Sequence, residues 1–156
     1  MTLRIALAQA AAGPDPARNL EHALAMMDRA AEAGARLVAF PELAVTRFFP
    51  QWERFDGARA LAEPIPGPTT DRVARKAAGH GLVTVFNLYE RAGGKHYDSS
   101  PVFDADGTLL GVTRMVHITD YACFHEQRYY DPGDRGAPVY DTRVGRVGVA
   151  ICYDRH

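Results

Sequence analysis

Residues 3–42 read LRIALAQAAAGPDPARNLEHALAMMDRAAEAGARLVAFPE, and this stretch decides the fold. Apolar residues alternate with more tolerant positions over residues 3–7, which predicts a first strand. Asp15 as N-cap and Pro16 at the first helical position then predict a helix, whose apolar residues recur at helical spacing. Residues 35–42 predict a short buried strand. A strand, a helix and a strand in this order are typical of parallel pairing in an α/β protein.

The rest of the chain continues the pattern with strands and one further helix. In order, the sequence predicts an aromatic- and proline-rich connection over 47–68, a helix over 70–79, a strand over 82–90, a hairpin over 99–118 and two strands within 137–152. The Asp106-Gly107 pair supplies the hairpin turn. About six strands and two helices make a mixed sheet with helices on one face. We expect the other face to lack cover, because nothing else in the chain could supply a layer.

Composition narrows the class of protein. The 156 residues fit one domain, and 47% hydrophobic residues can build a core. The net charge is −1 with both signs interleaved, so we expect neither nucleic acid nor a membrane as partner. Two cysteines are too few for a secreted disulfide framework. The sequence therefore predicts a cytoplasmic α/β domain over residues 1–156.

Three polar residues follow predicted strands, where ligands bind in open α/β sheets: Glu42, His117 and Cys152. If Asp154 capped a following helix, the Cys152 sulfur would lie at a helix N-terminus, which lowers the pKa of a thiol. Taken alone, Cys152 is better explained as a buried core cysteine. Glu42 could accept the thiol proton as a general base, and it fits an ion pair or plain exposure equally well.

Other candidates are weaker from the residues alone. Glu126 lies in a polar, aromatic loop and by itself would be interpreted as a solvated acid. Cys123, His125 and His117 have a spacing that fits no structural zinc site, so we expect no metal.

Four ordered stretches carry a resemblance to a known family, namely residues 40–51 (FPELAVTRFFPQ), 99–118 (SSPVFDADGTLLGVTRMVHI), 126–134 (EQRYYDPGD) and 147–156 (VGVAICYDRH). Together they resemble the nitrilase, or carbon-nitrogen hydrolase, superfamily. Residues 41–52 and 126–141 look most like N-carbamoyl-D-amino acid amidohydrolases. Residues 151–156 are also similar to β-ureidopropionases and other carbamoyl-amide hydrolases.

The resemblance implies an αββα sandwich whose subunits usually pair, and a Glu-Lys-Cys triad with a supporting glutamate. Carried over by motif, the general base is Glu42, the nucleophile is Cys152 and the supporting glutamate is Glu126. The implied reaction hydrolyses an N-carbamoyl amino acid to ammonia and carbon dioxide, without metal or cofactor. A homo-oligomer, or association through an exposed sheet, is expected.

The chain departs from the family pattern at the triad lysine, whose position is Met115. Methionine has neither a charge nor a hydrogen-bond donor. Losing one oxyanion donor typically costs about a hundred- to a thousandfold in rate. Arg114 should face the opposite side of the strand, whereas His117 shares the face of Met115 and could support the site.

The second departure concerns extent. The resemblance implies a domain that continues about as far again beyond the cysteine, so we expect this chain to be the N-terminal, truncated part of the sandwich.

Several alternatives remain open from sequence. Arg155, near the nucleophile, suits a substrate carboxylate and so favours carbamoyl amino acids, but an ordinary surface ion pair explains it as well. A nitrilase or aliphatic amidase fits the same triad. A non-catalytic fragment that binds or complements another chain is favoured by Met115 and the expected truncation. A redox protein using Cys123 and Cys152 lacks a Cys-x-x-Cys pair.

Overall fold

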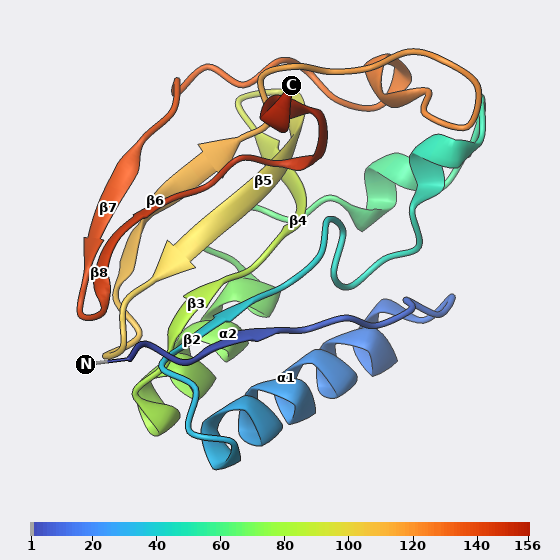
Figure 1. The fold of residues 1–156 in the computed structure, drawn as a ribbon. Coiled ribbons are helices and arrows are strands. Elements are labelled where there is room, and N and C mark those ends of the chain that lie inside the picture. Colours follow the sequence, from blue (N-terminus) through green and yellow to red (C-terminus); the bar gives the residue numbers. More distant parts are fainter. Residues whose placement is uncertain (1) are drawn as a thin grey trace.

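The computed structural model describes residues 2–156. Six strands form one mixed sheet and two more form a separate hairpin (Figure 1). The elements are β1 (Ile5–Leu7), α1 (Pro16–Glu32), β2 (Leu37–Ala39), α2 (Pro68–His80), β3 (Val83–Val85), β4 (Leu88–Ala92), β5 (Lys95–Phe103), β6 (Leu109–Arg114), β7 (Val139–Thr142) and β8 (Gly145–Gly148). Neither of the two helices is both long and apolar enough to cross a membrane.

The predicted strand–helix–strand beginning is confirmed. β1 pairs in parallel with β2, and β2 pairs in parallel with β3. Helix α1 begins at Pro16 because the Asp15 side chain accepts a hydrogen bond from the Ala17 N–H at 2.9 Å. The chain leaves the helix through Gly34, whose φ of 74° is a left-handed conformation that glycine adopts at little cost.

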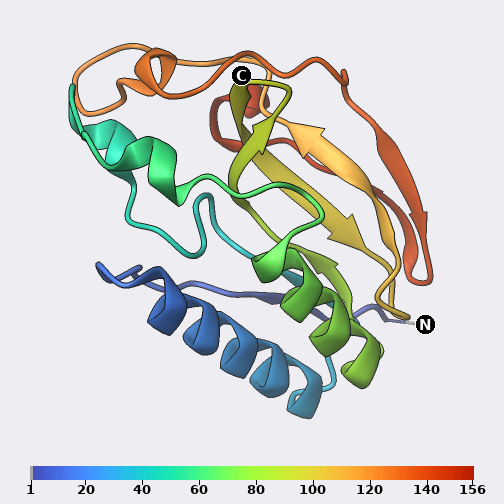
Figure 2. The same cartoon turned by 180° about the vertical axis from the view of Figure 1, so that it is seen from behind.

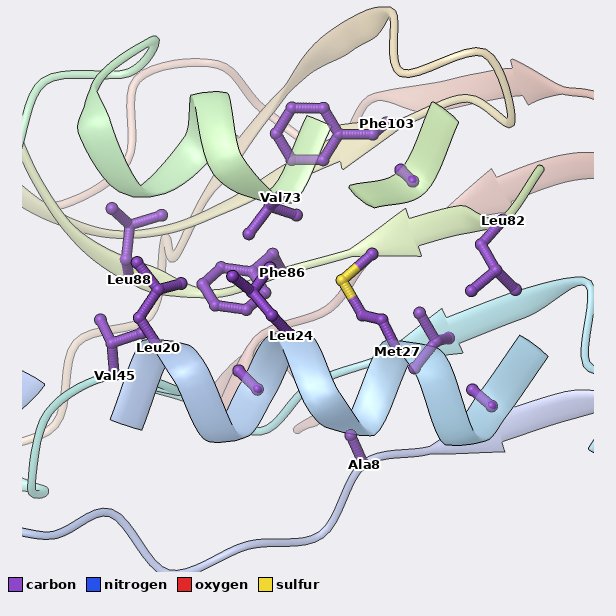
Figure 3. Packing of buried hydrophobic residues seen from close by; sticks show 14 of the residues in the cluster. Ala8, Leu20, Leu24, Met27, Val45, Val73, Leu82, Phe86, Leu88 and Phe103 are labelled. Atoms are coloured by element: carbon purple, nitrogen blue, oxygen red, sulfur yellow. The ribbon is translucent and has the colours of Figure 1, made fainter. Parts of the chain in front are cut away.

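Both helices cover one face of the sheet, as predicted (Figures 1 and 2). The helical spacing of the apolar residues explains this, because it puts them on one stripe of each helix. Figure 3 shows the resulting core. The helices contribute Leu20, Leu24, Met27 and Val73, and the sheet and its connections contribute Leu82, Phe86, Leu88 and Phe103.

The expectation that the other face lacks cover is wrong for the part of the sheet that includes β3, β5 and β6. The β7–β8 hairpin packs across it, with Tyr140 against Val85 and Val102. Tyr140 can approach because β6 has no side chain at Gly111, where an added Cβ would lie 2.6 Å from the tyrosine ring. These two strands are thus a second, small layer and not additional strands of the main sheet.

The cover does not extend to β1. Ile5 is 51% exposed and Leu7 is 80% exposed. Within residues 2–156, β1 pairs with β2 alone and is therefore an edge strand.

The single strand predicted over 82–90 is divided into β3 and β4 at Asn87. The Asn87 side chain explains the break, because it forms hydrogen bonds with the backbone of Leu43 and with side chains of β5. Its oxygen accepts from the Leu43 N–H at 2.6 Å, and its nitrogen donates to Asp98 at 2.5 Å and to the Ser100 hydroxyl at 3.1 Å. Strand β5 then pairs with β3 through one half and with β4 through the other.

The long connection over 47–68 folds back on the loop that carries Glu126. Phe49 is buried in the connection, with its ring centroid 5.0 Å from that of Tyr89 and 5.1 Å from that of Tyr129. This aromatic cluster forms a second core that fixes the loop over residues 119–134.

A buried ion pair crosses the sheet from β6 to β4. The Arg114 guanidinium donates to both carboxylate oxygens of Glu90, at 2.6 and 2.8 Å, and to Asp134 at 2.7 Å. It also lies 3.9 Å from the centre of the Tyr97 ring. The Arg114 guanidinium is therefore occupied by Glu90, Asp134 and the Tyr97 ring.

We predict that Arg114→Ala lowers the free energy of unfolding by about 3–5 kcal/mol, because it leaves the Glu90 charge buried without a partner. Urea unfolding followed by far-ultraviolet circular dichroism measures this change. Arg54→Ala is the matched control, since the Arg54–Asp56 pair is 83% and 77% exposed and should contribute about 0–1 kcal/mol. Equal losses in the two variants would contradict the prediction.

Candidate active site

The structure brings together Glu42, Glu126 and Cys152, which are widely separated in sequence. One carboxylate oxygen of each glutamate and the Cys152 sulfur all lie within 4.8 Å of one another. Glu42 follows β2, Glu126 begins a 3-10 turn in the loop after β6, and Cys152 follows β8. Two carboxylates and a thiol therefore share one small volume.

Glu42 is held by the backbone that follows it. Leu43 adopts φ of 51°, and its N–H donates to the Asn87 side chain at 2.6 Å. The Ala44 N–H donates to the Asn87 carbonyl at 3.1 Å. One carboxylate oxygen of Glu42, Oε1, is buried with no hydrogen-bond partner, so it is available for a ligand or a proton.

Glu126 is completely buried. Its Oε2 accepts a hydrogen bond from the Thr119 N–H at 3.0 Å, whereas Oε1 has no partner. Burial disfavours the charged form and raises the pKa of Glu126 above its ordinary value, with a smaller contribution from the Glu42 charge.

Cys152 is half-buried and has φ of 47°. Burial raises the pKa of its thiol to about 12, and the Glu42 and Glu126 charges act in the same direction. The expectation of a lowered thiol pKa is therefore wrong. Within the described residues, Cys152 begins a 3-10 turn over Cys152–Arg155.

Asp154 does not cap a following α-helix. Its carboxylate accepts from the N–H groups of Val116, at 3.1 Å, and His117, at 2.9 Å. Asp154 thereby ties the turn that contains Cys152 to the segment that follows β6.

Met115 is completely buried at the end of β6. Its N–H donates to the Asp98 carbonyl and its carbonyl accepts from the Gly133 N–H, so its backbone is fixed on both sides. Among residues 2–156, no lysine, arginine or histidine forms an ion pair with Glu42 or Glu126. No basic side chain of the described residues therefore offsets a charge on either glutamate.

His117 and Arg155 do not join the three clustered residues. The His117 side chain is 65% exposed and its Nδ1 lies 2.9 Å from Asp154. Arg155 is exposed, and its Nε lies 3.3 Å from the His156 ring nitrogen. Neither residue lines the cavity beside Cys152.

Two further groups of the site were missed by sequence reasoning. Asp98 is completely buried in β5, and burial together with nearby Glu42 raises the pKa of its carboxyl well above the ordinary value. Tyr130 is buried with its hydroxyl unpartnered, and burial and the charges of Asp98, Glu42 and Glu126 raise the pKa of that hydroxyl. Asp98 lies between the strand predicted over 82–90 and the hairpin predicted over 99–118, so no predicted strand contained it, and Tyr130 gave no signal either.

A cavity of about 620 Å³ opens beside the cluster. Glu42, Asn87, Ser100, Cys152 and Arg146 supply its polar groups. The remaining walls are apolar and come mainly from the exposed edge of the sheet and from β8, including Ile5, Leu37, Val85, Val147 and Ile151. The cavity can hold a small molecule against the Cys152 sulfur.

Residues 4–156 match the family model described as carbon-nitrogen hydrolase, and the chain belongs to that family. A crystal structure of a carbon-nitrogen hydrolase from Helicobacter pylori G27 superposes with a TM-score of 0.89 at 29% identity, over 98% of this chain and 52% of that one. The fold is thus that of the nitrilase superfamily.

Curated relatives carry carbamoyl-amide names. The chain is 35% identical to an N-carbamoylputrescine amidase of Solanum lycopersicum, over 97% of this chain and 50% of the relative. It is 31% identical to a citrullinase of Francisella tularensis subsp. tularensis, over 98% and 54%. The chain spans about half the length of the curated relatives it matches.

We predict that iodoacetamide modifies Cys152 slowly at pH 7, because a thiol pKa of about 12 leaves on the order of one molecule in 10⁵ as thiolate. Glu42→Gln should accelerate the reaction, since it removes a charge that opposes ionisation. Peptide mass spectrometry over time measures both cysteines, with exposed Cys123 as internal control. Modification of Cys152 as fast as that of Cys123 would contradict this.

We predict that Glu126→Gln raises the free energy of unfolding by about 1–2 kcal/mol at pH 7, because the amide can donate to Glu42 without a buried charge. In the unmodified chain, the raised pKa of Glu126 gives a stabilisation that is complete below its ordinary value of 4.5 and is lost as the pH rises through the folded-state pKa. Thermal unfolding between pH 4 and 8 should show a flatter profile in the variant.

Glu53→Gln is the matched control, because the Glu53 side chain is 72% exposed. A pH profile that changes equally in both variants would refute the assignment to Glu126.

Proposed function

We propose that this chain provides the base and the nucleophile of a hydrolase that acts on a small carbamoyl amide, and that its residues form the N-terminal part of a nitrilase-type sandwich. The observation that carries the proposal is the position of the Cys152 sulfur within 4.8 Å of carboxylate oxygens of both Glu42 and Glu126, beside a cavity of suitable size. The carbamoyl names of the relatives support the substrate class.

The raised thiol pKa defines the first step. Cys152 begins as a neutral thiol, so Glu42 must accept its proton as the sulfur attacks the carbamoyl carbon. Glu42 then passes the proton to the departing nitrogen, which leaves as ammonia, and a carbamoyl thioester remains on sulfur.

The second half-reaction uses water. Glu42 accepts a proton from the water as its oxygen attacks the thioester carbon, and the proton returns to the Cys152 sulfur. The carbamic acid that is released breaks down to the amine and carbon dioxide. In this scheme Glu126, which accepts a hydrogen bond from the Thr119 N–H, is a fixed polar neighbour of Glu42.

Arg146 indicates which carbamoyl compounds fit. It lines the cavity, whereas Arg155 does not, so Arg146 is the better candidate to bind a substrate carboxylate. We therefore propose an N-carbamoyl amino acid as substrate. Hydrolysis of a nitrile or a simple amide would use Glu42 and Cys152 in the same way but would not need Arg146.

A non-catalytic role is the second candidate, and the absence of a neutralising cation among the described site residues favours it. An uncompensated cluster of Glu42, Asp98 and Glu126 stabilises a developing oxyanion poorly. In that case the chain would bind a ligand or a partner polypeptide without turnover.

We predict that Met115→Lys releases ammonia from N-carbamoyl amino acids about 10²–10³ times faster than the unmodified chain, because it supplies an oxyanion donor among the carboxylates. An enzyme-coupled ammonia assay on amino acid, amine and simple amide substrates measures this. Met115→Leu is the matched control and should not differ from the unmodified chain.

Adding Cys152→Ala to the lysine variant should abolish the release. A folded lysine variant that is silent on the whole panel, with circular dichroism unchanged, would overturn the hydrolase proposal in favour of the non-catalytic role.

A further inference from the structure

Glu42, Asp98 and Glu126 are acidic groups that form no ion pair within residues 2–156. Glu126 and Asp98 are completely buried, and one oxygen of each, together with Glu42 Oε1, has no hydrogen-bond partner. Burying carboxylates without partners is costly unless a proton or a cation compensates them. The methyl and thioether groups of Met115 provide neither.

The cluster combines two carboxylates with one thiol as possible metal ligands. Glu42, Glu126 and Cys152 each present one donor atom, and these atoms lie within 4.8 Å of one another. Ligands bound tetrahedrally at zinc bond lengths lie about 3.5 Å apart, so side-chain movements of roughly 1 Å would close the site. The Cys152 sulfur and Glu42 also face the cavity, which provides an entry path and room for a water as fourth ligand.

The Tyr130 hydroxyl is an independent indication. It is buried and has no hydrogen-bond partner, and the Tyr130 N–H donates to the Glu126 carbonyl at 2.8 Å, which holds this residue one turn after Glu126. A free donor beside the cluster is suited to hold a metal-bound water or the second oxygen of a ligating carboxylate.

We propose that Glu42, Glu126 and Cys152 form a binding site for a divalent transition metal ion of the zinc class. The thiolate selects this class, since calcium and magnesium are bound by oxygen ligands and sulfur favours zinc and related ions. On binding, the thiol proton leaves to solvent and the sulfur–metal bond forms, with no change in oxidation state.

The three proposed ligands are distinct from Cys123, His125 and His117, whose spacing in the sequence fits no structural zinc site. Cys123 is exposed, His117 contacts Asp154, and His125 lies 3.4 Å from Asp120. The proposal also does not depend on the hydrolase function. The metal would occupy the sulfur that attacks the substrate, so the ion acts as an inhibitor of any hydrolysis and not as its cofactor.

The test uses the full chain freed of metal by a chelator and titrated with Co²⁺, then with Zn²⁺ in competition. We expect one Co²⁺ per chain and a near-ultraviolet thiolate-to-cobalt charge-transfer band that Zn²⁺ removes. Calorimetry in buffers of different ionisation enthalpy should show proton release on Zn²⁺ binding.

Variants connect the signal to the site. Cys152→Ser should abolish the charge-transfer band, and Glu126→Gln should weaken Zn²⁺ binding at least about tenfold, since loss of an outer-shell contact alone typically costs that much. Cys123→Ser and Met115→Leu are the matched controls and should bind normally. Met115→Lys should weaken binding by a similar factor, because its ammonium competes for the same carboxylates.

A charge-transfer band that survives Cys152→Ser, or that disappears in Cys123→Ser, would overturn the proposal. So would Zn²⁺ affinity that is unchanged in folded Glu126→Gln. Hydrolysis is measured separately in the presence of chelator, so that failure of the metal site and failure of the hydrolase activity give different results.

Discussion

The side chain of Asn87 is the contact on which the rest of the site depends. It interrupts the strand that would otherwise run from β3 into β4, and it bonds to the Leu43 N–H, Asp98 and Ser100. One amide thus connects the turn after Glu42 to the middle of β5. Because every polar atom of this buried amide is used, its position is fixed, and so is the direction in which Glu42 leaves the sheet.

The fold could be predicted from sequence wherever local pattern determined it. The N-cap at Asp15, the helical spacing of α1 and the Asp106-Gly107 turn are local signals, and each element formed where expected. The two failures depended on distant contacts. The β7–β8 layer forms because Tyr140 meets Gly111, and the strand break at Asn87 is made by partners in other segments.

Less of the candidate site than of the fold could be predicted from the sequence. Ordered motifs singled out Glu42, Glu126 and Cys152, but no local rule indicates how far apart such residues lie in space. The hypotheses for His117 and Arg155 depended on the course of the last turn, which the Asp154 contacts determine. Asp98 escaped notice because neighbouring polar residues in the first half of β5 masked a buried carboxylate.

The backbone at Leu43 and Cys152 leads to a consequence for folding. Both residues have positive φ without being glycine, a conformation that costs roughly 1–2 kcal/mol each. The free energy that keeps them there must come from elsewhere, chiefly from the apolar packing between the helices and the sheet. A substitution that weakens this packing is therefore expected to alter the backbone at Leu43 and Cys152 as well as the stability of the chain.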